Sequence, residues 1–147
     1  MPPRRTQRAV AEAAPLEAAR AAAGARGGAG SQDPLVGELR RAGLLPLLVL
    51  HFLGEGPSYG GRLIERVEDT TGGLIAPNPN TMYPLLRDLE ARGLVAAEWE
   101  HPERRSRRFY RLTPAGEAER DELATALGPR LDAIAAGVAG VRRELEL

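Results

Sequence analysis

One stretch decides the fold of this chain of 147 residues: Asn78-Pro79-Asn80-Thr81-Met82-Tyr83-Pro84-Leu85-Leu86-Arg87-Asp88-Leu89-Glu90-Ala91-Arg92-Gly93. Its large apolar residues follow the i, i+3, i+4, i+7 spacing that places them on one face of a helix. They are Met82, Leu85, Leu86 and Leu89. Because glycine is common directly after a helix, this helix is predicted to end at Gly93.

The opposite face of the same helix differs from an ordinary solvated surface. A helix face that only meets water normally carries Glu and Lys, which form i,i+4 pairs and keep the protein soluble. Here that face carries a phenol, an arginine and small residues: Asn80, Tyr83, Pro84, Arg87 and Ala91. Such a face suits close contact with another surface.

Pro84 limits where this helix can begin. A proline deep inside a helix costs about 3 kcal/mol, because it removes a backbone hydrogen bond and clashes with the preceding turn. We therefore expect Asn80 or Thr81 to be the N-cap, which places Pro84 in or beside the first turn.

The composition fits one domain with tails and a core of modest size. The formal net charge is zero, so any binding of a polyanion must come from local clusters of the 20 basic residues. The chain has no cysteine, which excludes disulfides and thiol chemistry and fits a reducing cytoplasm.

No segment predicts a membrane protein or a secreted one. The longest apolar run, residues 44–53, contains Pro46 and His51 and is about half the length that spans a bilayer. The N-terminus lacks the apolar core of a secretory signal. We expect a soluble protein of the cytoplasm that does not bind a membrane.

Residues 1–32 are rich in Ala, Gly and Arg and hold few large apolar side chains. Such a segment cannot offset the entropy cost of ordering, so we interpret it as a disordered arm with a transient helix near residues 10–23. Its arginines outnumber its acidic residues, which leaves open a contact with a phosphate backbone. A solvated tail is the simpler interpretation.

Two helices are predicted before the stretch quoted above. Order begins at Asp33-Pro34, an N-cap residue followed by proline at the first helical position. Residues 44–53 continue as a core helix that is apolar nearly all round. Ser58 is the expected N-cap of a second helix, which runs to about Thr70 and is stopped by Thr71-Gly72-Gly73.

After Gly93 the period of the apolar residues changes from helical to alternating. Residues 94–100 and 107–113 are predicted to form the two strands of a hairpin, joined by a loop over residues 101–106. Charged hairpin tips often serve only solubility and the protection of edge strands. Here four arginines in five positions, against the single acid Glu103, favour contact with a polyanion. They are Arg104, Arg105, Arg107 and Arg108.

Thr113 and Pro114 predict the start of a last helical region. Gly128-Pro129 interrupts this region, so we expect a kink or two helices. Its apolar residues recur every three or four positions in a seam like that of a coiled coil. The seam extends beyond what one small helical core can cover, so pairing with a second copy explains it better than packing within the chain. The seam residues are Leu123, Leu127, Leu131, Ile134, Val138, Val141 and Leu145.

Together these elements predict a mainly α chain with a small β-hairpin and a C-terminal dimerisation helix. The order of the elements is that of a winged helix-turn-helix, in which the third helix enters the major groove of DNA. The hairpin, or wing, lies along the backbone or in the minor groove. We expect three regions: the arm over residues 1–32, the winged helix over residues 33–113 and the dimerisation helix over residues 114–147.

Four stretches carry distinctive motifs: Gly56-Pro57-Ser58-Tyr59-Gly60, Thr71-Gly72-Gly73-Leu74, residues 79–95, and Arg108-Phe109-Tyr110-Arg111-Leu112-Thr113-Pro114-Ala115-Gly116. Together these motifs resemble the PadR family of bacterial transcriptional regulators. The resemblance implies a homodimeric, repressor-like protein that binds a palindromic operator and is released by a small hydrophobic effector. The chain departs from the family at Gly61, where an aromatic is common, and at Asn80, where a small residue is common. The C-terminal region holds no aromatic residue, so a pocket that sandwiches flat drugs is not expected.

The resemblance places Thr81, Tyr83 and Pro84 at the DNA-facing start of the third helix. On this helix, the side chains of Tyr83 and Asn80 suit base edges, and Arg87 suits a phosphate or a guanine. Hydroxyl groups at the helix starts suit phosphates, and the wing arginines supply affinity that falls with salt. The expected DNA-binding residues are Ser58, Tyr59, Asn80, Thr81, Tyr83, Pro84, Arg87, Arg104, Arg105, Arg107 and Arg108.

A winged-helix adaptor that binds protein instead of DNA is the open alternative. An enzyme is not expected, because the sequence shows no Ser/His/Asp, metal-ligand or phosphate-loop constellation. His51 has no second ligand at metal-binding spacing, and Gly72-Gly73 is too short for a nucleotide-binding loop. No metal and no cofactor are expected.

Overall fold

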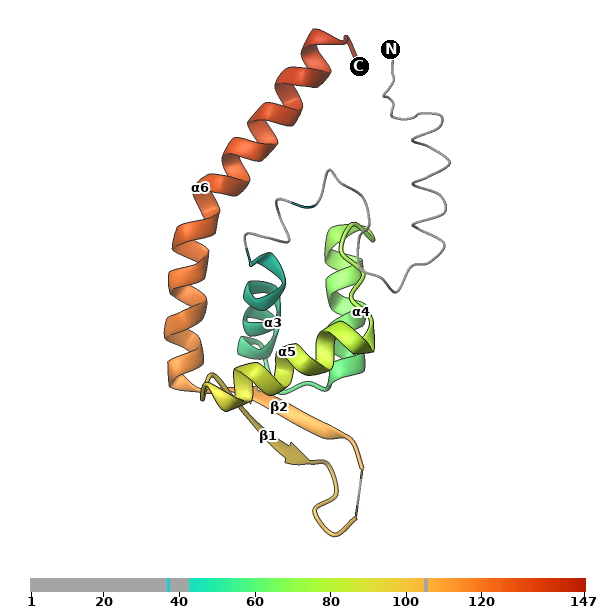
Figure 1. Ribbon diagram of the computed structural model, residues 1–147, viewed down its shortest axis with the longest axis vertical. Helices are drawn as coiled ribbons and strands as arrows, with labels where there is room; N and C mark the ends of the chain where they lie inside the picture. The colour runs from blue at the N-terminus through green and yellow to red at the C-terminus, as the bar shows by residue number, and fades with distance from the viewer. Residues whose placement is uncertain (1–36, 38–42, 105) are drawn as a thin grey trace. The chain divides into compact units, whose positions relative to one another are not determined.

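The computed structural model describes residues 37, 43–104 and 106–147 (Figure 1). The predictions of a disordered arm and of a helix start at Asp33-Pro34 lie outside the described residues. The described elements are α3 (Leu44–Gly54), α4 (Gly60–Thr71), α5 (Pro79–Ala91), β1 (Val95–Trp99), β2 (Arg108–Leu112) and α6 (Pro114–Glu144). The prediction of a mainly α chain with a small β-hairpin is confirmed.

The elements fall into two compact units, of which the first contains α4 and most of α5. In this unit α4 buries Leu63 and Val67, which lie four residues apart on one face. The helix ends as predicted, because Gly72 and Gly73 adopt the left-handed conformation, with φ of 61° and 86°. The hydroxyl of Thr71 donates to the carbonyl of Val67 at 2.9 Å and accepts the N–H of Ile75 at 3.0 Å, which closes the turn after the helix.

The start of α5 differs from the prediction. The cap is Asn78, whose Oδ1 accepts the N–H of Thr81 at 3.0 Å, and Pro79 is the first helical residue. Neither Asn80 nor Thr81 is the cap, and Pro84 lies inside the helix instead of in its first turn. The physical reason is that Asn78-Pro79 is itself a cap followed by a proline at N1. The helix tolerates Pro84 because the carbonyl that loses its donor belongs to exposed Asn80, where water can replace the bond.

The end of α5 is confirmed at Gly93. This glycine has a φ of 76°, and its N–H donates to the carbonyl of Glu90 at 3.0 Å. The N–H of Leu94 donates to the carbonyl of Leu89 at 2.9 Å. This pair of bonds is the Schellman arrangement, which satisfies the last carbonyls of a helix and turns the chain away. The turn leads directly into β1.

The second unit contains α3, the hairpin and α6. The two strands pair antiparallel as predicted, with Val95 opposite Leu112 and Trp99 opposite Arg108. Ser58 adds a short bridge to β2, because its backbone exchanges hydrogen bonds with Tyr110 at 3.0 and 2.8 Å. The hairpin is called the wing below and comprises β1, β2 and the loop between them.

In the second unit, α3 packs against α6 and β2. Its buried side chains are Val49, Leu50, Phe52 and Leu53, and α6 buries Leu127. His51 points to solvent and lies 3.4 Å from the carboxylate of Glu55, one turn along the same helix. The prediction of a core helix over residues 44–53 therefore holds, apart from the exposed face that carries His51.

The helix α6 begins as predicted, since the side chain of Thr113 accepts the N–H of Gly116 at 3.0 Å and Pro114 follows it. The helix is continuous over 31 residues, so the alternative of two helices is wrong. It does change direction near its middle, where Gly128-Pro129 lies (Figure 1). A proline inside a helix typically produces such a kink because its ring crowds the preceding turn.

None of the helices in the described ranges combines the length and apolarity needed to cross a bilayer.

Gly116 packs closely against Leu112 of β2 and against the backbone of Leu94, the residue before β1. A Cβ atom at this position would clash with the backbone carbonyl of Leu94 and lie 2.6 Å from Cδ1 of Leu112. Because a backbone atom cannot swing away, we expect Gly116→Ala to lower the free energy of unfolding by about 1–3 kcal/mol. Chemical denaturation measures this difference.

The matched control is Gly137→Ala in the same helix, where a Cβ atom would meet nothing within 4 Å. This change is expected to be neutral or to stabilise by up to about 1 kcal/mol, because alanine favours helices. Equal unfolding midpoints for the two variants would contradict the packing described for Gly116.

Candidate nucleic-acid interface

The two faces of α5 are sharply divided by burial. Met82, Leu86 and Leu89 are completely buried, as the apolar spacing predicted, whereas Leu85, the fourth residue of that predicted face, is half-buried. The opposite face is exposed and presents the side chains of Asn80, Thr81, Tyr83, Pro84 and Arg87. All five residues predicted from this stretch are therefore accessible to a partner.

Two of these side chains stand out by chemistry. The ring of Tyr83 is 38% exposed, which is high for a large aromatic residue. Within the part of the chain that the structure describes, the guanidinium of Arg87 makes no ion pair. Hydroxyl and guanidinium donors that are free to bond suit the acceptors of base edges and phosphates.

Ser58 and Tyr59 lie before α4, not at its cap position as predicted for Ser58. The helix begins at Gly60, and the backbone of Ser58 is held by its bridge to Tyr110. The ring of Tyr59 packs on the wing, with its centroid 5.6 Å from that of Phe109. The guanidinium of Arg107 lies over the same ring, 4.1 Å from its centroid. Tyr59 is thus half-buried and supports the wing.

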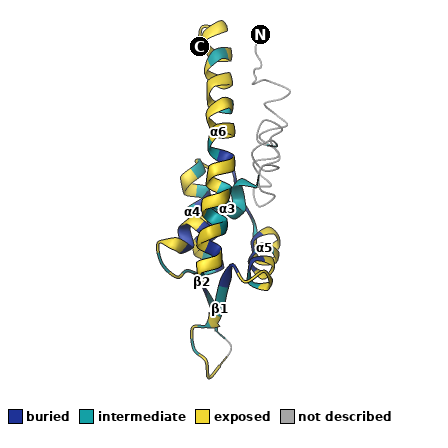
Figure 2. Cartoon of the chain, turned by 90° about the vertical axis from the view of Figure 1, so that its left-hand side faces the viewer, coloured by how far each residue is buried: buried dark blue, intermediate teal, exposed yellow. Residues whose placement is uncertain are grey.

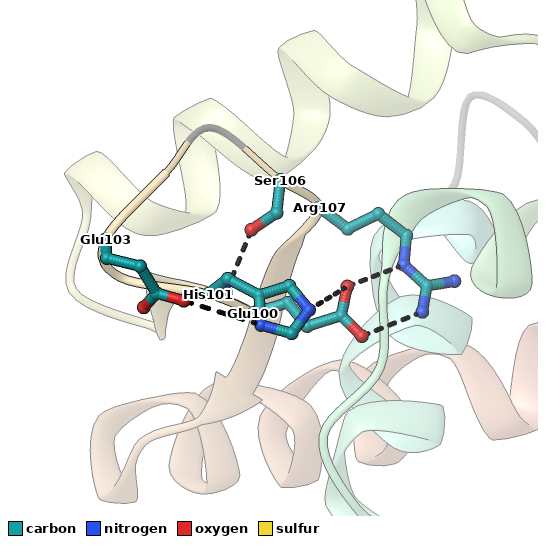
Figure 3. A network of polar contacts seen from close by, with 5 residues as sticks. All are labelled: Glu100, His101, Glu103, Ser106 and Arg107. Atoms are coloured by element: carbon teal, nitrogen blue, oxygen red, sulfur yellow. Dashed lines mark hydrogen bonds and ion pairs between the residues drawn. The ribbon is translucent and has the colours of Figure 1, made fainter.

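Arg107 is held by a carboxylate of its own chain. Its Nε and Nη2 donate to the two carboxylate oxygens of Glu100 at 3.2 and 3.1 Å (Figure 3). The hydrogen bond from Arg107 lowers the pKa of the Glu100 carboxyl, and the same bond raises the pKa of Arg107. The pair is therefore fully charged at neutral pH, and it is lost only as the pH falls through the lowered pKa of Glu100.

Arg108 is also engaged within the chain. Its Nη2 lies 3.2 Å from the carboxylate of Glu90, and its guanidinium lies 5.4 Å from the ring centroid of Trp99. Its Nε is buried and has no hydrogen-bond partner among the described residues. The side chain is only 37% exposed. Arg108 thus connects β2 to the C-terminal end of α5.

The wing is less basic than its sequence suggested. Glu103 was the only acid counted against its four arginines, whereas Glu100 and Glu90 each neutralise one of them. Arg104 is exposed, and Arg105 lies outside the described residues. Both missed carboxylates lie outside the predicted loop over residues 101–106, Glu90 in α5 and Glu100 directly after β1. The one available signal was that Glu100 and Arg107 flank the predicted loop, so that a hairpin would place them opposite each other.

The loop of the wing is held by polar contacts at its base (Figure 3). The backbone N–H of His101 donates to Oγ of Ser106 at 2.9 Å. The imidazole of His101 lies 4.0 Å from the carboxylates of both Glu100 and Glu103. These contacts fix the end of the hairpin from which Arg104 projects.

Comparison with known proteins decides the family. Residues 49–122 match the model of the transcriptional regulator PadR-like family. The chain belongs to this family. It is a transcriptional regulator, and the PadR-like assignment made from the motifs is confirmed.

Individual PadR-like relatives agree with this assignment. The chain is 37% identical over 81 residues to a transcriptional regulator of Mycobacterium tuberculosis, a stretch that covers 55% of this chain and 72% of the relative. The structure of a PadR family transcriptional regulator from Eggerthella lenta is 36% identical, with a TM-score of 0.57 over 70% of this chain and 88% of that chain. A putative transcriptional regulator from Thermoplasma acidophilum is 26% identical, with a TM-score of 0.58 over 67% of this chain and 92% of that chain. The names of all three proteins describe transcriptional regulators, the class that the motifs predicted for this chain.

The PadR-like match ends at residue 122, one position before the seam of α6 begins. Burial divides the seam into two parts. Leu123 and Ile134 are half-buried and Leu127 is buried, whereas Leu131, Val138 and Val141 are 36%, 55% and 58% exposed. Figure 2 shows this exposure along the C-terminal half of the helix. Among the described residues, nothing therefore covers Leu131, Val138 and Val141 of the predicted dimerisation surface.

Proposed function

We propose that this PadR-like regulator acts as a homodimeric repressor that binds operator DNA in a sequence-specific way. The observation that carries the proposal is the division of α5, which buries Met82, Leu86 and Leu89 completely while its outer face exposes Tyr83 and Arg87. A rigid helix with polar and aromatic side chains on its free face suits insertion into a major groove.

Each of the five α5 residues predicted to bind DNA has a role in this proposal. Tyr83 and Asn80 contact base edges, and Arg87 binds a guanine or a phosphate. Thr81 donates to a phosphate near the start of the helix, and Pro84 packs against the DNA surface. Ser58 and Tyr59 add contacts to phosphates. These contacts give the protein its register on the duplex and its choice of sequence.

The wing adds affinity that does not depend on sequence. Arg104 is exposed and available to a phosphate. The proposal gives the same role to Arg105, which lies outside the described residues. Arg107 and Arg108 contribute to phosphate binding only to the extent that DNA competes with Glu100 and Glu90. The carboxylates therefore set how much positive charge the wing offers.

Dimerisation through the exposed part of the α6 seam completes the proposal. Two copies joined there present two recognition helices to the two halves of a palindromic operator. Repression follows if the bound dimer blocks transcription, and the protein acts in the cytoplasm.

A small hydrophobic effector releases the dimer by changing the separation of the two α5 helices. A hollow of about 280 Å³ on the wing, lined in part by Trp99, Phe109 and Tyr110, is large enough for a small molecule.

A winged-helix adaptor that binds protein is the second candidate function. The observation that favours it is the pairing of Arg107 and Arg108 with carboxylates of the chain, on a protein of zero net charge. The salt dependence of the binding affinity distinguishes the two functions. DNA binding releases counterions, so its affinity falls steeply as salt rises, whereas a protein partner gives a much shallower dependence.

The test is a salt series of DNA binding with two single variants of the wing. Arg104→Ala is expected to weaken binding to operator and unrelated DNA alike, and to reduce the slope of log K against log salt by about 0.9 for each phosphate that is no longer neutralised.

Glu100→Gln keeps the size of the side chain but removes the charge that holds Arg107. It is expected to raise the affinity severalfold and to steepen the slope.

Fluorescence anisotropy with labelled duplexes measures both quantities. The matched control is Glu122→Gln on the exposed surface of α6, which removes one negative charge outside the wing. It is expected to leave the affinity nearly unchanged. An affinity of the wild type that does not vary with salt would contradict the DNA-binding proposal and favour the adaptor.

A further inference from the structure

Gly60, the first residue of α4, is buried beneath the ring of Tyr83. A Cβ atom at this position would lie 2.5 Å from Cε1 of the tyrosine and 2.7 Å from both Cζ and Oη. Real Cβ atoms essentially never approach other atoms so closely. The edge of the ring that carries the hydroxyl thus occupies the place where any other residue would have its side chain.

The glycine is required here for space and not for backbone conformation. The described glycines with positive φ are Gly43, Gly56, Gly72, Gly73 and Gly93, and Gly60 is not among them. An alanine at this position would therefore meet no backbone strain. The three heavy atoms that its Cβ would approach most closely all belong to the side chain of Tyr83.

The contact with Gly60 holds one edge of the Tyr83 ring and leaves the rest of the side chain accessible. The side chain remains 38% exposed, so the face that is proposed to meet DNA stays accessible. One edge rests on Gly60, which restricts the ring to a narrow set of orientations. A side chain that is already oriented loses less entropy on binding, and its hydroxyl is held where the partner needs it.

We propose that Gly60 is a positioning residue, which acts through Tyr83 to orient its hydroxyl for DNA. This inference rests on the proposed function, in which Tyr83 contacts a base edge. It assigns to the glycine of α4 a role in the affinity and specificity of α5. Gly60 itself makes no contact with DNA in this role.

The test is a double-mutant cycle of Gly60→Ala and Tyr83→Ala, with operator affinity as the readout. Gly60→Ala alone is expected to lower the affinity roughly 5- to 50-fold, a substantial part of the loss from removing the tyrosine, because the methyl group pushes the ring away. In the Tyr83→Ala background the same glycine change is expected to have almost no effect, since no ring remains to be displaced. An undiminished loss in that background would overturn the positioning role.

Two further measurements separate this role from a general loss of stability. The denaturation midpoints of all four proteins in the cycle are compared first, and Gly60→Ala is expected to unfold at nearly the wild-type midpoint because the ring can move toward solvent. A Gly60→Ala variant that keeps the full operator affinity would overturn the proposal.

A readout without DNA distinguishes failure of this inference from failure of the proposed function. In the free protein, NMR is expected to detect short distances between the α-protons of Gly60 and the ring protons of Tyr83, and to lose them in Gly60→Ala. Absence of these short distances in the wild type overturns the positioning role alone. Their presence in a wild type that binds no DNA selectively overturns the proposed function, and the positioning role with it.

Discussion

Replacing Tyr83 with alanine is expected to lower the affinity for the operator roughly 5- to 150-fold, because one good base contact is worth about 1–3 kcal/mol of discrimination. The loss is expected to be much smaller on unrelated DNA, where the phosphate contacts dominate. The change therefore removes specificity more than general affinity. Anisotropy titrations with operator and unrelated duplexes at one salt concentration measure the two losses side by side.

The Tyr83→Ala variant tests DNA contact separately from folding. Tyr83 lies on the exposed face of α5, while Met82, Leu86 and Leu89 anchor the opposite face. Its removal should leave the packing of the helix intact. Tyr83→Phe is the matched variant, because it keeps the ring on Gly60 and removes only the hydroxyl. If Tyr83→Ala weakened operator and unrelated DNA equally, the base-reading role of Tyr83 would be wrong.

The second large effect is expected from charges placed in the α6 seam. Val138 and Val141 are 55% and 58% exposed in the single chain, so aspartate at both positions should not disturb the fold of a protomer. In a dimer held by this seam, two buried carboxylates on each side would repel and lose their hydration. We expect Val138→Asp/Val141→Asp to be monomeric at micromolar concentrations in analytical ultracentrifugation.

Loss of the dimer is expected to reduce operator affinity at least about 100-fold, because the second half-site then no longer benefits from a high effective concentration. The control is Ala136→Asp, an exposed position about 160° around the helix from Val138 by the rotation of 100° per residue. This variant is expected to remain dimeric and to bind DNA. A Val138→Asp/Val141→Asp protein that still sediments as a dimer would place the dimer contact elsewhere on the chain.

Local signals in the sequence predicted much of the fold. The end of α5 at Gly93, the start of α6 at Thr113 and the hairpin between them each depend on residues that lie within a few positions of one another. Capping residues, glycines and alternating apolar residues act over such short ranges. These features could therefore be found without knowledge of the tertiary structure.

The start of α5 was predicted wrongly because two residues within three positions, Asn78 and Asn80, can each serve as the N-cap. Both Asn78 and Asn80 are good caps, and the argument from Pro84 favoured the later one. The structure shows that Asn78 caps the helix and that an exposed turn accommodates Pro84. The energy cost of a proline depends on whether the carbonyl it leaves free can reach water, which the sequence does not tell.

The contacts that shape the candidate site were also hidden from sequence reasoning. Glu90 reaches Arg108 across 18 positions, and Gly60 meets Tyr83 across a complete helix and a turn. Such pairs depend on how helices and strands pack, and the type of a residue does not indicate which distant residue it contacts. A carboxylate near an arginine cluster and a glycine at a helix start each have many ordinary explanations.

The central claim is that this PadR-like protein selects a DNA sequence, and one measurement tests it most directly. Purified wild-type protein is titrated, at a salt concentration near physiological, into labelled DNA from upstream of its own gene and into a scrambled duplex of equal length and composition. Preference for the upstream DNA by about 1,000-fold or more is the result predicted for a specific regulator that recognises its own promoter. Equal affinity for the two duplexes, or binding to neither, would contradict the proposal at that operator.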